Sequence, residues 1–578
     1  MGRRLSSCAR RRGGEPGGAS ATLTTLAALL TLLATLSACR GRGPVPDRDP
    51  PAQVAEVSLF FTTELAGTLE PCGCTSDPLG DLARTAALVA TARAARPTVL
   101  FDGGSTLYPE ASLAADRRPQ AELSADLLAN VLPTLGLAAA ALGPLDLAAG
   151  PGGLRLPRHA VNLPESAGIP LVAPRVLTLG GARIGVFGVV DPALVPLLAA
   201  TDPMAAARTA VLALRADGAD LIVALAHLPR AAARRLAREV AGIDLVLVGA
   251  GAAEPADRDH VAVETAGNSF LLQPLARGQS VVRVDLALRA GAASGLTDAI
   301  GAARAATLRA DLDAKLVTRS AELAAWERQP DADREFVAAR RAEVDELTRT
   351  RDELVRRPLR VPERGSWFVA EELRVTRDLP CDAAVVEQKR VRDRAVGEAN
   401  RRAFATETPA AVPPGAAGYA GLAECGYCHA AAVEFWKTTR HAVAWETLEV
   451  REKQWDRECI GCHVTGWLEP GGATMGASDA LRDVQCETCH GPASLHVEFD
   501  GKERPSSLVR ATPESRCATC HSPEHSDTFD YRAYLRDVTG PGHGEAYRRE
   551  LGDGPTGKAL RAAALARAAR TIGAACPR

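Results

Sequence analysis

The C-terminal third of the chain repeats one short cysteine–histidine unit four times. The unit is Cys-x-x-Cys-His, and its copies are CGYCH from 425, CIGCH from 459, CETCH from 486 and CATCH from 517. Two thiols three positions apart on one turn can form thioethers with the two vinyl groups of a haem, and the next residue then lies beneath the iron. The spacing therefore predicts four covalently bound haem c groups. Their attachment residues are Cys425, Cys428, Cys459, Cys462, Cys486, Cys489, Cys517 and Cys520.

Structural zinc is the competing interpretation of these units, because paired Cys-x-x-Cys motifs can supply four thiolates to one ion. Zinc leaves the histidine after every second cysteine unexplained, whereas a c-type haem uses it as the proximal ligand of the iron. We therefore favour haem. The expected proximal ligands are His429, His463, His490 and His521.

The histidine count suggests what fills the opposite side of each iron. Of the 11 histidines in the chain, eight follow residue 424, and four of those lie outside the attachment units. Two axial imidazoles give a low-spin haem that keeps both ligands in either oxidation state, which suits electron transfer. A surface histidine is the alternative for each position. The candidate distal ligands are His441, His496, His543 and His525. His525 follows the proximal His521 by only four residues.

Residues 419–547 resemble the multihaem cytochrome c domain of the tetrahaem carriers that accept electrons from hydroxylamine oxidoreductase. The resemblance is carried by EFWKTTRHAVAWETL, ECIGCHVTGW, VQCETCHGPASLHV and CATCHSPEHSDTFDYRAYLRDVTGPGHGEA. It implies a mostly helical, loop-rich fold around closely stacked haems. It also implies that the histidines of TRHA, SLH and GPGH are distal ligands and that one haem can remain five-coordinate.

The N-terminal half has a different organisation. Between residues 57 and 290, apolar segments of strand length alternate with Ala-, Arg- and Leu-rich segments of helical length, which predicts an α/β layered domain. The expected strands are VSLFFTT, TVLFDGG, ARIGVFGVV, DLIVALAH, DLVLVGA, HVAVETAG and SVVRVDLAL.

The segments TTELAG, FDGG, LGPLDLAAG, ALAHLP and VGAGAAEP follow one another in this domain. Their order resembles that of the metal-binding motifs in the metallophosphatase domain of periplasmic 5'-nucleotidases. A two-metal hydrolase needs a full set of Asp, Asn and His ligands. Only Asp102 and His227 match that set, so we expect a degenerate metallophosphatase fold without hydrolase activity and with no catalytic residue. Cys72 and Cys74 could bind a metal or lie at a haem edge; a disulfide or free thiols are the alternatives. The other ligand positions carry Glu64, Pro144, Leu145, Ala250 and Ala252.

The N-terminus has the features of an export signal. Basic MGRRLSSCARRRGGEPGG precedes apolar ATLTTLAALLTLLATLSAC. The last four residues of that run resemble a bacterial lipobox, in which Cys39 becomes lipidated; a transmembrane anchor is the alternative. We expect a lipid-anchored protein on the periplasmic side of a bacterial membrane.

The remaining segments complete the domain plan. Apolar stripes on both sides of Pro330 predict an antiparallel helical hairpin that acts as a spacer or dimer surface. Cys381 and Cys576 have no partner that the sequence indicates. The expected domains are 1–39, signal peptide with lipobox; 40–56, linker; 57–290, metallophosphatase-like α/β domain; 300–357, helical hairpin; 358–418, connecting strand, helix and linker; 419–547, mostly helical and loop-rich tetrahaem cytochrome c domain; and 548–578, helical tail.

Composition narrows the function. A formal net charge of -2 gives no signal for nucleic-acid binding. We expect an electron carrier whose partners are redox proteins or quinol-linked donors; the sequence does not indicate an oligomeric state. Two alternatives stay open. One is a multihaem oxidoreductase acting on a small nitrogen or sulfur compound at an open haem, and the other is a phosphoesterase with an attached redox domain.

Overall fold

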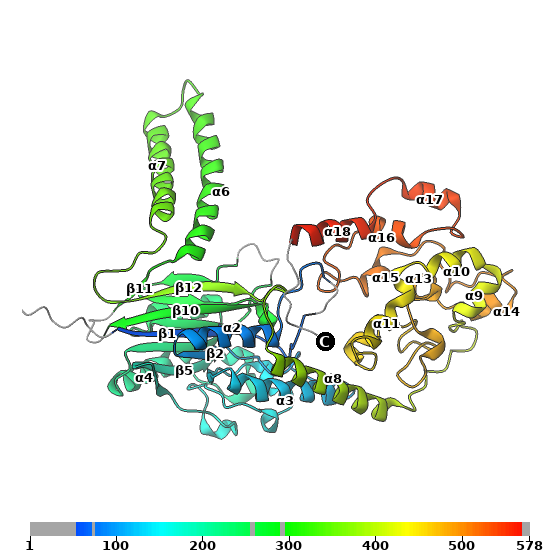
Figure 1. The fold of residues 1–578 in the computed structure, drawn as a ribbon, viewed down its shortest axis with the longest axis horizontal. Helices are drawn as coiled ribbons and strands as arrows, with labels where there is room; N and C mark the ends of the chain where they lie inside the picture. Colours follow the sequence, from blue (N-terminus) through cyan, green and yellow to red (C-terminus); the bar gives the residue numbers. More distant parts are fainter. Residues whose placement is uncertain (1–53, 72–74, 255–259, 290–294, 569–578) are drawn as a thin grey trace, which may run out of the picture. The chain divides into compact units, whose positions relative to one another are not determined.

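The computed structural model describes residues 54–568 except 72–74, 255–259 and 290–294 (Figure 1). The expected signal peptide, the lipobox with Cys39, the Cys72 and Cys74 pair and Cys576 lie outside the described residues. Within the described ranges, every helix is too short or too polar to cross a membrane.

Two sheets of six strands each form the centre of the α/β domain. In the first sheet β1 is parallel to β2 and antiparallel to β10, and in the second sheet β5, β6, β7 and β9 are parallel. The first sheet has the order β11 (Leu296–Asp298), β12 (Ser366–Arg374), β10 (Ser280–Arg289), β1 (Val54–Thr62), β2 (Thr98–Asp102) and β3 (Leu137–Ala140). The second has the order β4 (Arg175–Leu179), β5 (Ala182–Val190), β6 (Leu221–Pro229), β7 (Leu245–Ala250), β9 (Ser269–Leu272) and β8 (Val263–Ala266).

Apolar side chains cover both faces of each sheet. Phe61 and Phe101 of the first sheet pack with Val223 and Leu247 of the second in one core. Helices cover the outer faces: α2 (Leu82–Ala95), α3 (Arg118–Thr134) and α8 (Ala383–Phe404) pack on the first sheet, and α4 (Pro203–Ala216) and α5 (Arg230–Glu239) on the second. Burial on both faces explains why these strands are almost continuously apolar in sequence.

The predicted α/β layered fold is confirmed, and each expected strand is present. The domain continues beyond its expected end at residue 290. Strand β12, which the sequence assigns to the connecting segment 358–418, pairs with β10 from Ser280 opposite Arg374 to Ala287 opposite Trp367. Helix α8 of the same segment places Val385 in the core with α2 and α3.

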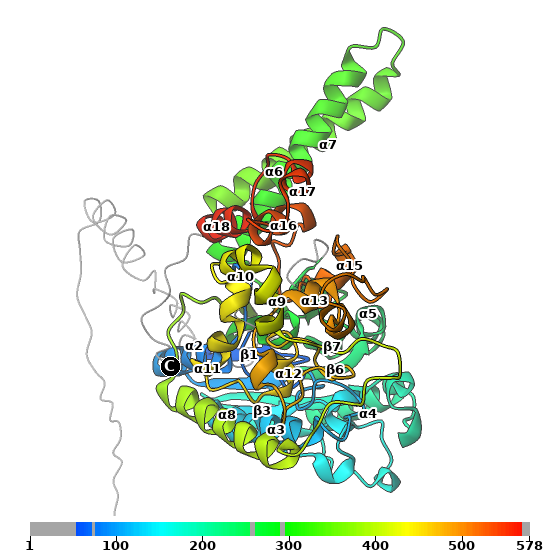
Figure 2. The same cartoon turned by 90° about the vertical axis from the view of Figure 1, so that its right-hand side faces the viewer.

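The helical hairpin is therefore an insertion between β11 and β12. It consists of α6 (Ala302–Glu327) and α7 (Arg334–Arg356), which lie side by side as predicted (Figures 1 and 2). Asp333 caps α7 by accepting hydrogen bonds from the backbone N–H groups of Glu335 and Phe336, at 2.8 and 3.1 Å. At the turn, the Trp326 and Phe336 rings meet edge to face with centroids 5.2 Å apart.

The C-terminal region is mostly helical and loop-rich, as predicted. Its apolar core is small and consists of Trp445, Ile460, Val464, Ala473, Met475 and Leu481. The main helices are α9 (Leu422–Cys428), α10 (Ala430–Trp436), α11 (Ala444–Glu449), α12 (Arg457–Ile460), α13 (Cys486–His490), α14 (Ser494–Glu498), α15 (Glu514–Ala518), α16 (Tyr531–Val538), α17 (Glu545–Leu551) and α18 (Gly557–Ala568).

Candidate multihaem site

Each cysteine–histidine unit lies on or at the end of one short helix. Backbone hydrogen bonds of a helical turn span the first and fourth units, from His429 N–H to the Cys425 carbonyl at 2.9 Å and from His521 N–H to the Cys517 carbonyl at 2.9 Å. Residues three apart on such a turn share a face, so the two thiols of a unit point the same way. All eight attachment cysteines are reduced thiols in the structure, whereas Cys381, for which the sequence indicates no partner, is disulfide-bonded.

The four units line one cavity of about 2620 Å³. That volume exceeds the roughly 300–1,000 Å³ of an ordinary small-molecule pocket and suits several large ligands. All the predicted site residues except the exposed Cys428 line this cavity, including the four candidate distal histidines His441, His496, His525 and His543.

The units are neighbours in pairs. The Cys425 thiol of the first unit is hydrogen-bonded to Cys486 of the third, which raises the pKa of Cys425. The Cys520 thiol of the fourth unit is hydrogen-bonded to Cys462 of the second, which lowers the pKa of Cys520 to about 6. The first unit therefore lies beside the third and the second beside the fourth.

Several candidate ligands have their Nδ1 atoms held by the protein. Nδ1 lies 2.6 Å from the Ala444 carbonyl in His463, 2.9 Å from the Val509 carbonyl in His490 and 2.6 Å from the Glu503 carbonyl in His496. A carbonyl can only accept, so each Nδ1 carries the proton and donates it. In the neutral ring Nε2 is then the nitrogen without a proton, and it is the one that can bind a metal.

Two histidine pairs have the separation expected for ligands on opposite sides of one metal ion. The ring centroids are 6.2 Å apart for His441 and His521 and 6.5 Å apart for His490 and His543. Two opposed bonds of about 2 Å, plus about 1.1 Å from each nitrogen to its ring centre, give roughly 6.2 Å. A tetrahedral zinc ion would hold its rings closer together.

Burial favours the neutral form of four of the candidate ligands. It lowers the pKa of His441 to about 4, with a further contribution from His521, and it lowers the pKa of His463, His521 and His543. A neutral imidazole is the form that binds a metal ion. The cavity, the paired cysteines and the neutral histidines therefore fit haem c.

The remnant of the expected metallophosphatase site lies at the C-terminal ends of the β strands. Asp102 is buried and accepts hydrogen bonds from Thr62 Oγ1 at 2.8 Å and Thr106 Oγ1 at 2.5 Å, and burial raises its pKa to about 6. His227 Nδ1 lies 2.8 Å from the Gly103 carbonyl. The Glu64 carboxylate accepts from the N–H groups of Gly251 and Ala252. The side chains of Asp102, His227 and Glu64 are therefore hydrogen-bonded to other groups of the protein.

A buried ion pair that the sequence did not indicate lies in the same area. Arg158 Nη2 is 2.8 Å from Asp146 Oδ1, and neither side chain is accessible to solvent. Asp146 also accepts backbone hydrogen bonds from Ser105, Thr106 and Gly143 at 2.9–3.0 Å. The described part of the chain contains no group of three or more His, Cys, Asp or Glu side chains arranged to hold a metal ion.

Comparison with known proteins shows that the C-terminal region is similar to c-type cytochromes. Residues 424–491 match the family model described as cytochrome c554 and c-prime. Cytochrome c-554 of Nitrosomonas europaea is 32% identical over a segment covering 18% of this chain and 57% of that protein. The chain thus spans somewhat more than half the length of this relative. The resemblance of the C-terminal region to this cytochrome family is confirmed.

Solved structures similar to the N-terminal half are nucleotidases and phosphoesterases. The 5'-nucleotidase precursor of Thermus thermophilus has a TM-score of 0.41 at 18% identity, covering 62% of this chain and 61% of that one. A calcineurin-like phosphoesterase of Bacillus subtilis has a TM-score of 0.32 at 21% identity, covering 41% of this chain and 86% of that one.

Proposed function

We propose that the protein is an extracytoplasmic tetrahaem c-type cytochrome that transfers electrons between redox partners. The observation that carries this proposal is the convergence of all four attachment units on one cavity. When bound, haem c supplies reversible one-electron chemistry at its iron. The chain would hold each group through two thioethers and one proximal histidine, and its cavity would exclude water from the macrocycles.

The histidine geometry supports specific axial pairs. We assign His441 opposite His521 and His543 opposite His490, because their ring separations suit two ligands on one iron. His496 is assigned to the first unit. Its helix α14 is tied to the segment before α9 by two hydrogen bonds between Ser494 and Gly418, at 2.8 and 3.0 Å.

His525 has weaker support as a ligand. Its Nδ1 lies 2.8 Å from Ser522 Oγ, a local contact that indicates no partner among the proximal histidines. We keep it as the fourth distal candidate, tested below.

The pairwise contacts between units support electron transfer among the haems. Thiols in contact, Cys425 with Cys486 and Cys462 with Cys520, imply that the groups attached to them are neighbours. Short separations between cofactors and ligands that stay bound in both oxidation states are the properties an electron relay needs.

A second candidate function is an oxidoreductase that binds a small nitrogen or sulfur compound at one open haem. His463 favours the oxidoreductase. The two histidine pairs with a ring separation near 6 Å in the described residues do not include His463, so its haem could have an open position. Carbon monoxide or cyanide would distinguish the two. An unchanged spectrum supports a pure carrier, and a ligand-induced shift in one haem supports the oxidoreductase.

We also propose that Cys39 carries a lipid anchor on the periplasmic side of a bacterial membrane and that redox proteins or quinol-linked donors are the partners. The signal and lipobox pattern supports the anchor. Radiolabelled palmitate should label the protein, and Cys39→Ala should abolish the label.

The N-terminal domain is proposed to lack hydrolase activity. Its support is the engagement of Asp102, His227 and Glu64 with protein groups. Hydrolysis of a generic phosphoester after addition of manganese or zinc would instead favour the phosphoesterase alternative.

The central experiment is expression with a c-type cytochrome maturation system, followed by intact mass and a reduced-minus-oxidised spectrum. We expect the mass of four covalently attached haems and the bands of a c-type cytochrome. Colourless protein with zinc bound to the thiols would overturn the proposal.

A further inference from the structure

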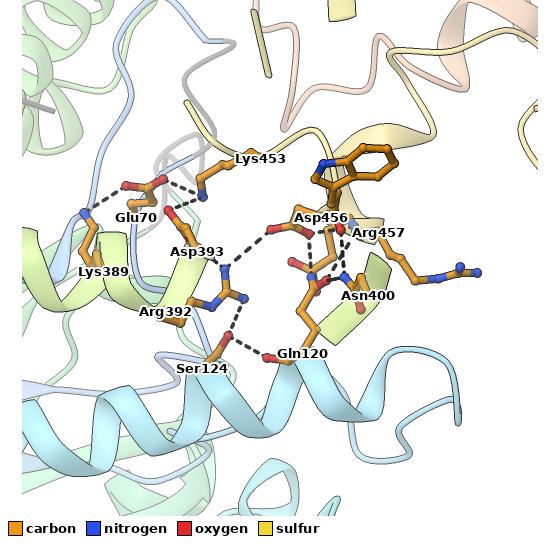
Figure 3. A network of polar contacts seen from close by, with 12 residues as sticks. Glu70, Gln120, Ser124, Lys389, Arg392, Asp393, Asn400, Lys453, Asp456 and Arg457 are labelled. Atoms are coloured by element: carbon orange, nitrogen blue, oxygen red, sulfur yellow. Dashed lines mark hydrogen bonds and ion pairs between the residues drawn. The ribbon is translucent and has the colours of Figure 1, made fainter. Parts of the chain in front are cut away.

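A buried polar network joins the α/β domain to the chain just before the second attachment unit (Figure 3). We call residues 453–457 the second-unit approach segment, because Cys459 follows two residues after its end. Its partners are Glu70, helix α3 and helix α8, all of which belong to the α/β domain.

Asp456 is the centre of the network. Its carboxylate caps α12, the helix that carries Cys459, by accepting from the Glu458 N–H at 3.0 Å. The same carboxylate accepts from Gln120 Nε2 at 2.6 Å and lies 3.5 Å from Arg392 Nη1. One side chain therefore fixes the start of the haem-bearing helix to both α3 and α8.

Lys453 provides a second link. Its ammonium group lies 2.8 Å from the Glu70 carboxylate, which also pairs with Lys389 of α8 at 2.9 Å. Burial alone would lower the pKa of Lys453, but Glu70 and Asp393 outweigh that effect and raise it. Lys453 is therefore charged and held by carboxylates on the α/β domain.

The remaining contacts fix the backbone of the segment. Asn400 of α8 donates to the Trp455 carbonyl at 2.8 Å and to Gln120 Oε1 at 3.0 Å. Arg457 pairs with Asp116 at 2.9 Å, and its guanidinium lies 4.1 Å from the centre of the Phe404 ring. The second-unit approach segment is thus held at Lys453, Trp455, Asp456 and Arg457.

The segment after the fourth unit also contacts the α/β domain, through the Arg277–Glu524 ion pair and through Ser76, whose N–H donates to Asp527 Oδ1 at 2.9 Å. The Arg277–Glu524 ion pair has side chains 41% and 55% exposed, whereas those of Arg392 and Asp456 are 9% and 7% exposed. Exposed pairs contribute little, while separating a buried pair leaves an unsolvated charge. The second unit is therefore distinguished by a buried ion pair that joins its approach segment to the α/β domain.

We propose that the α/β domain is a positioning domain for the second haem, a role that rests on the proposed multihaem function. Through Glu70, Gln120 and Arg392 it fixes the orientation of α12, and with it Cys459 and the environment of the haem attached there. Ligand orientation and burial set the potential of a haem. In this role the α/β domain influences the reduction potential of one haem and does not catalyse hydrolysis.

The test uses Asp456→Asn and Arg392→Gln in the full-length, haem-loaded protein. Asparagine still caps α12 and still accepts from Gln120, so Asp456→Asn removes only the charge that faces Arg392. The control is Arg390→Gln, which breaks an exposed pair with Glu387 on the same helix. Each variant is examined by intact mass, by electron paramagnetic resonance and by a redox titration resolved into its components.

We expect both network variants to keep four haems and to shift the midpoint potential and resonance signal of one haem, while Arg390→Gln matches the wild type. Network variants with all four signals unchanged would overturn the inference, as would a uniform shift of all four. If Arg392→Gln fails to fold and Asp456→Asn folds, the result for Asp456→Asn decides the test. Wild-type protein without haem would instead refute the proposed function itself.

Discussion

The imidazole rings of His441 and His521 lie 6.2 Å apart and tilted by 44°, although 80 positions separate them in the sequence. His441 precedes the second, third and fourth cysteine–histidine units, yet the fold brings it close to the histidine of the last unit. The proposed pairing of axial ligands therefore does not follow the order of the units in the sequence.

Replacing His441 by alanine should open one axial position. We expect His441→Ala to retain four covalent haems, since the attachment cysteines are unchanged, but to convert one haem in four from low to high spin. Electron paramagnetic resonance and carbon monoxide binding measure this. His525→Ala tests the fourth distal candidate: conversion of one haem to high spin would support His525 as a ligand, and an unchanged spectrum would remove it from the ligand set. A His441→Ala variant in which every haem stays low-spin would contradict the pairing of His441 with His521.

Replacing both thiols of one unit should remove one haem. Cys486→Ser with Cys489→Ser should lower the haem content from four to three, because the serine hydroxyl does not add to the vinyl groups. Intact mass and the pyridine haemochrome spectrum give the count. Thr488→Ser, between the same cysteines, keeps its hydroxyl near Thr465 and should retain four. A double variant that still carried four haems would contradict the assignment.

Asp102 should make the stability of the α/β domain depend on pH. Burial raises its pKa from 3.8 to about 6, so between those values the folded carboxyl keeps a proton that the unfolded one has lost. The free energy of unfolding should therefore fall by up to about 3 kcal/mol as the pH rises through that window, and it should stay low above it.

Asp102→Asn should remove this pH dependence and raise the melting temperature at pH 7, with little gain near pH 4, because the amide carries no charge and Thr62 can accept its N–H. Calorimetry at the two pH values measures the difference. Asp311→Asn, on the exposed surface of α6, is the control and should change neither value. Equal changes in melting temperature at pH 4 and pH 7 would show that Asp102 is not the source of the pH dependence.

The buried pair of Arg158 and Asp146 should be essential to the α/β domain. Arg158→Met leaves an unpaired carboxylate in the interior, and we expect it to cost roughly 3–5 kcal/mol. Adding Asp146→Asn should recover part of the loss by removing that charge. Urea unfolding followed by tryptophan fluorescence tests both variants. A double variant less stable than Arg158→Met would show that the charge is not the cause.

Chemistry that is local in sequence could be predicted here, and contacts that depend on the fold could not. The thiols of Cys425 and Cys428 identify an attachment unit because their function depends on a fixed spacing. The pairing of His441 with His521 depends on tertiary structure, which no spacing reveals. Strand β12 was assigned to a connector because the α6–α7 hairpin separates it in sequence from its neighbour β10.

The buried network was also beyond prediction. Gln120, Arg392 and Asp456 come from three distant segments, and each alone resembles an ordinary surface residue. In the same way, Arg158 and Asp146 gave no sign in the sequence that they would be fully buried together.

The C-terminal region has a small apolar core, and its four cysteine–histidine units line a cavity of about 2620 Å³. Macrocycles with large apolar faces would fill that space, so the prosthetic groups themselves would serve as the interior on which the surrounding helices condense. We expect this region to become compact only after haem has been attached, and protein without haem to be degraded faster by proteases.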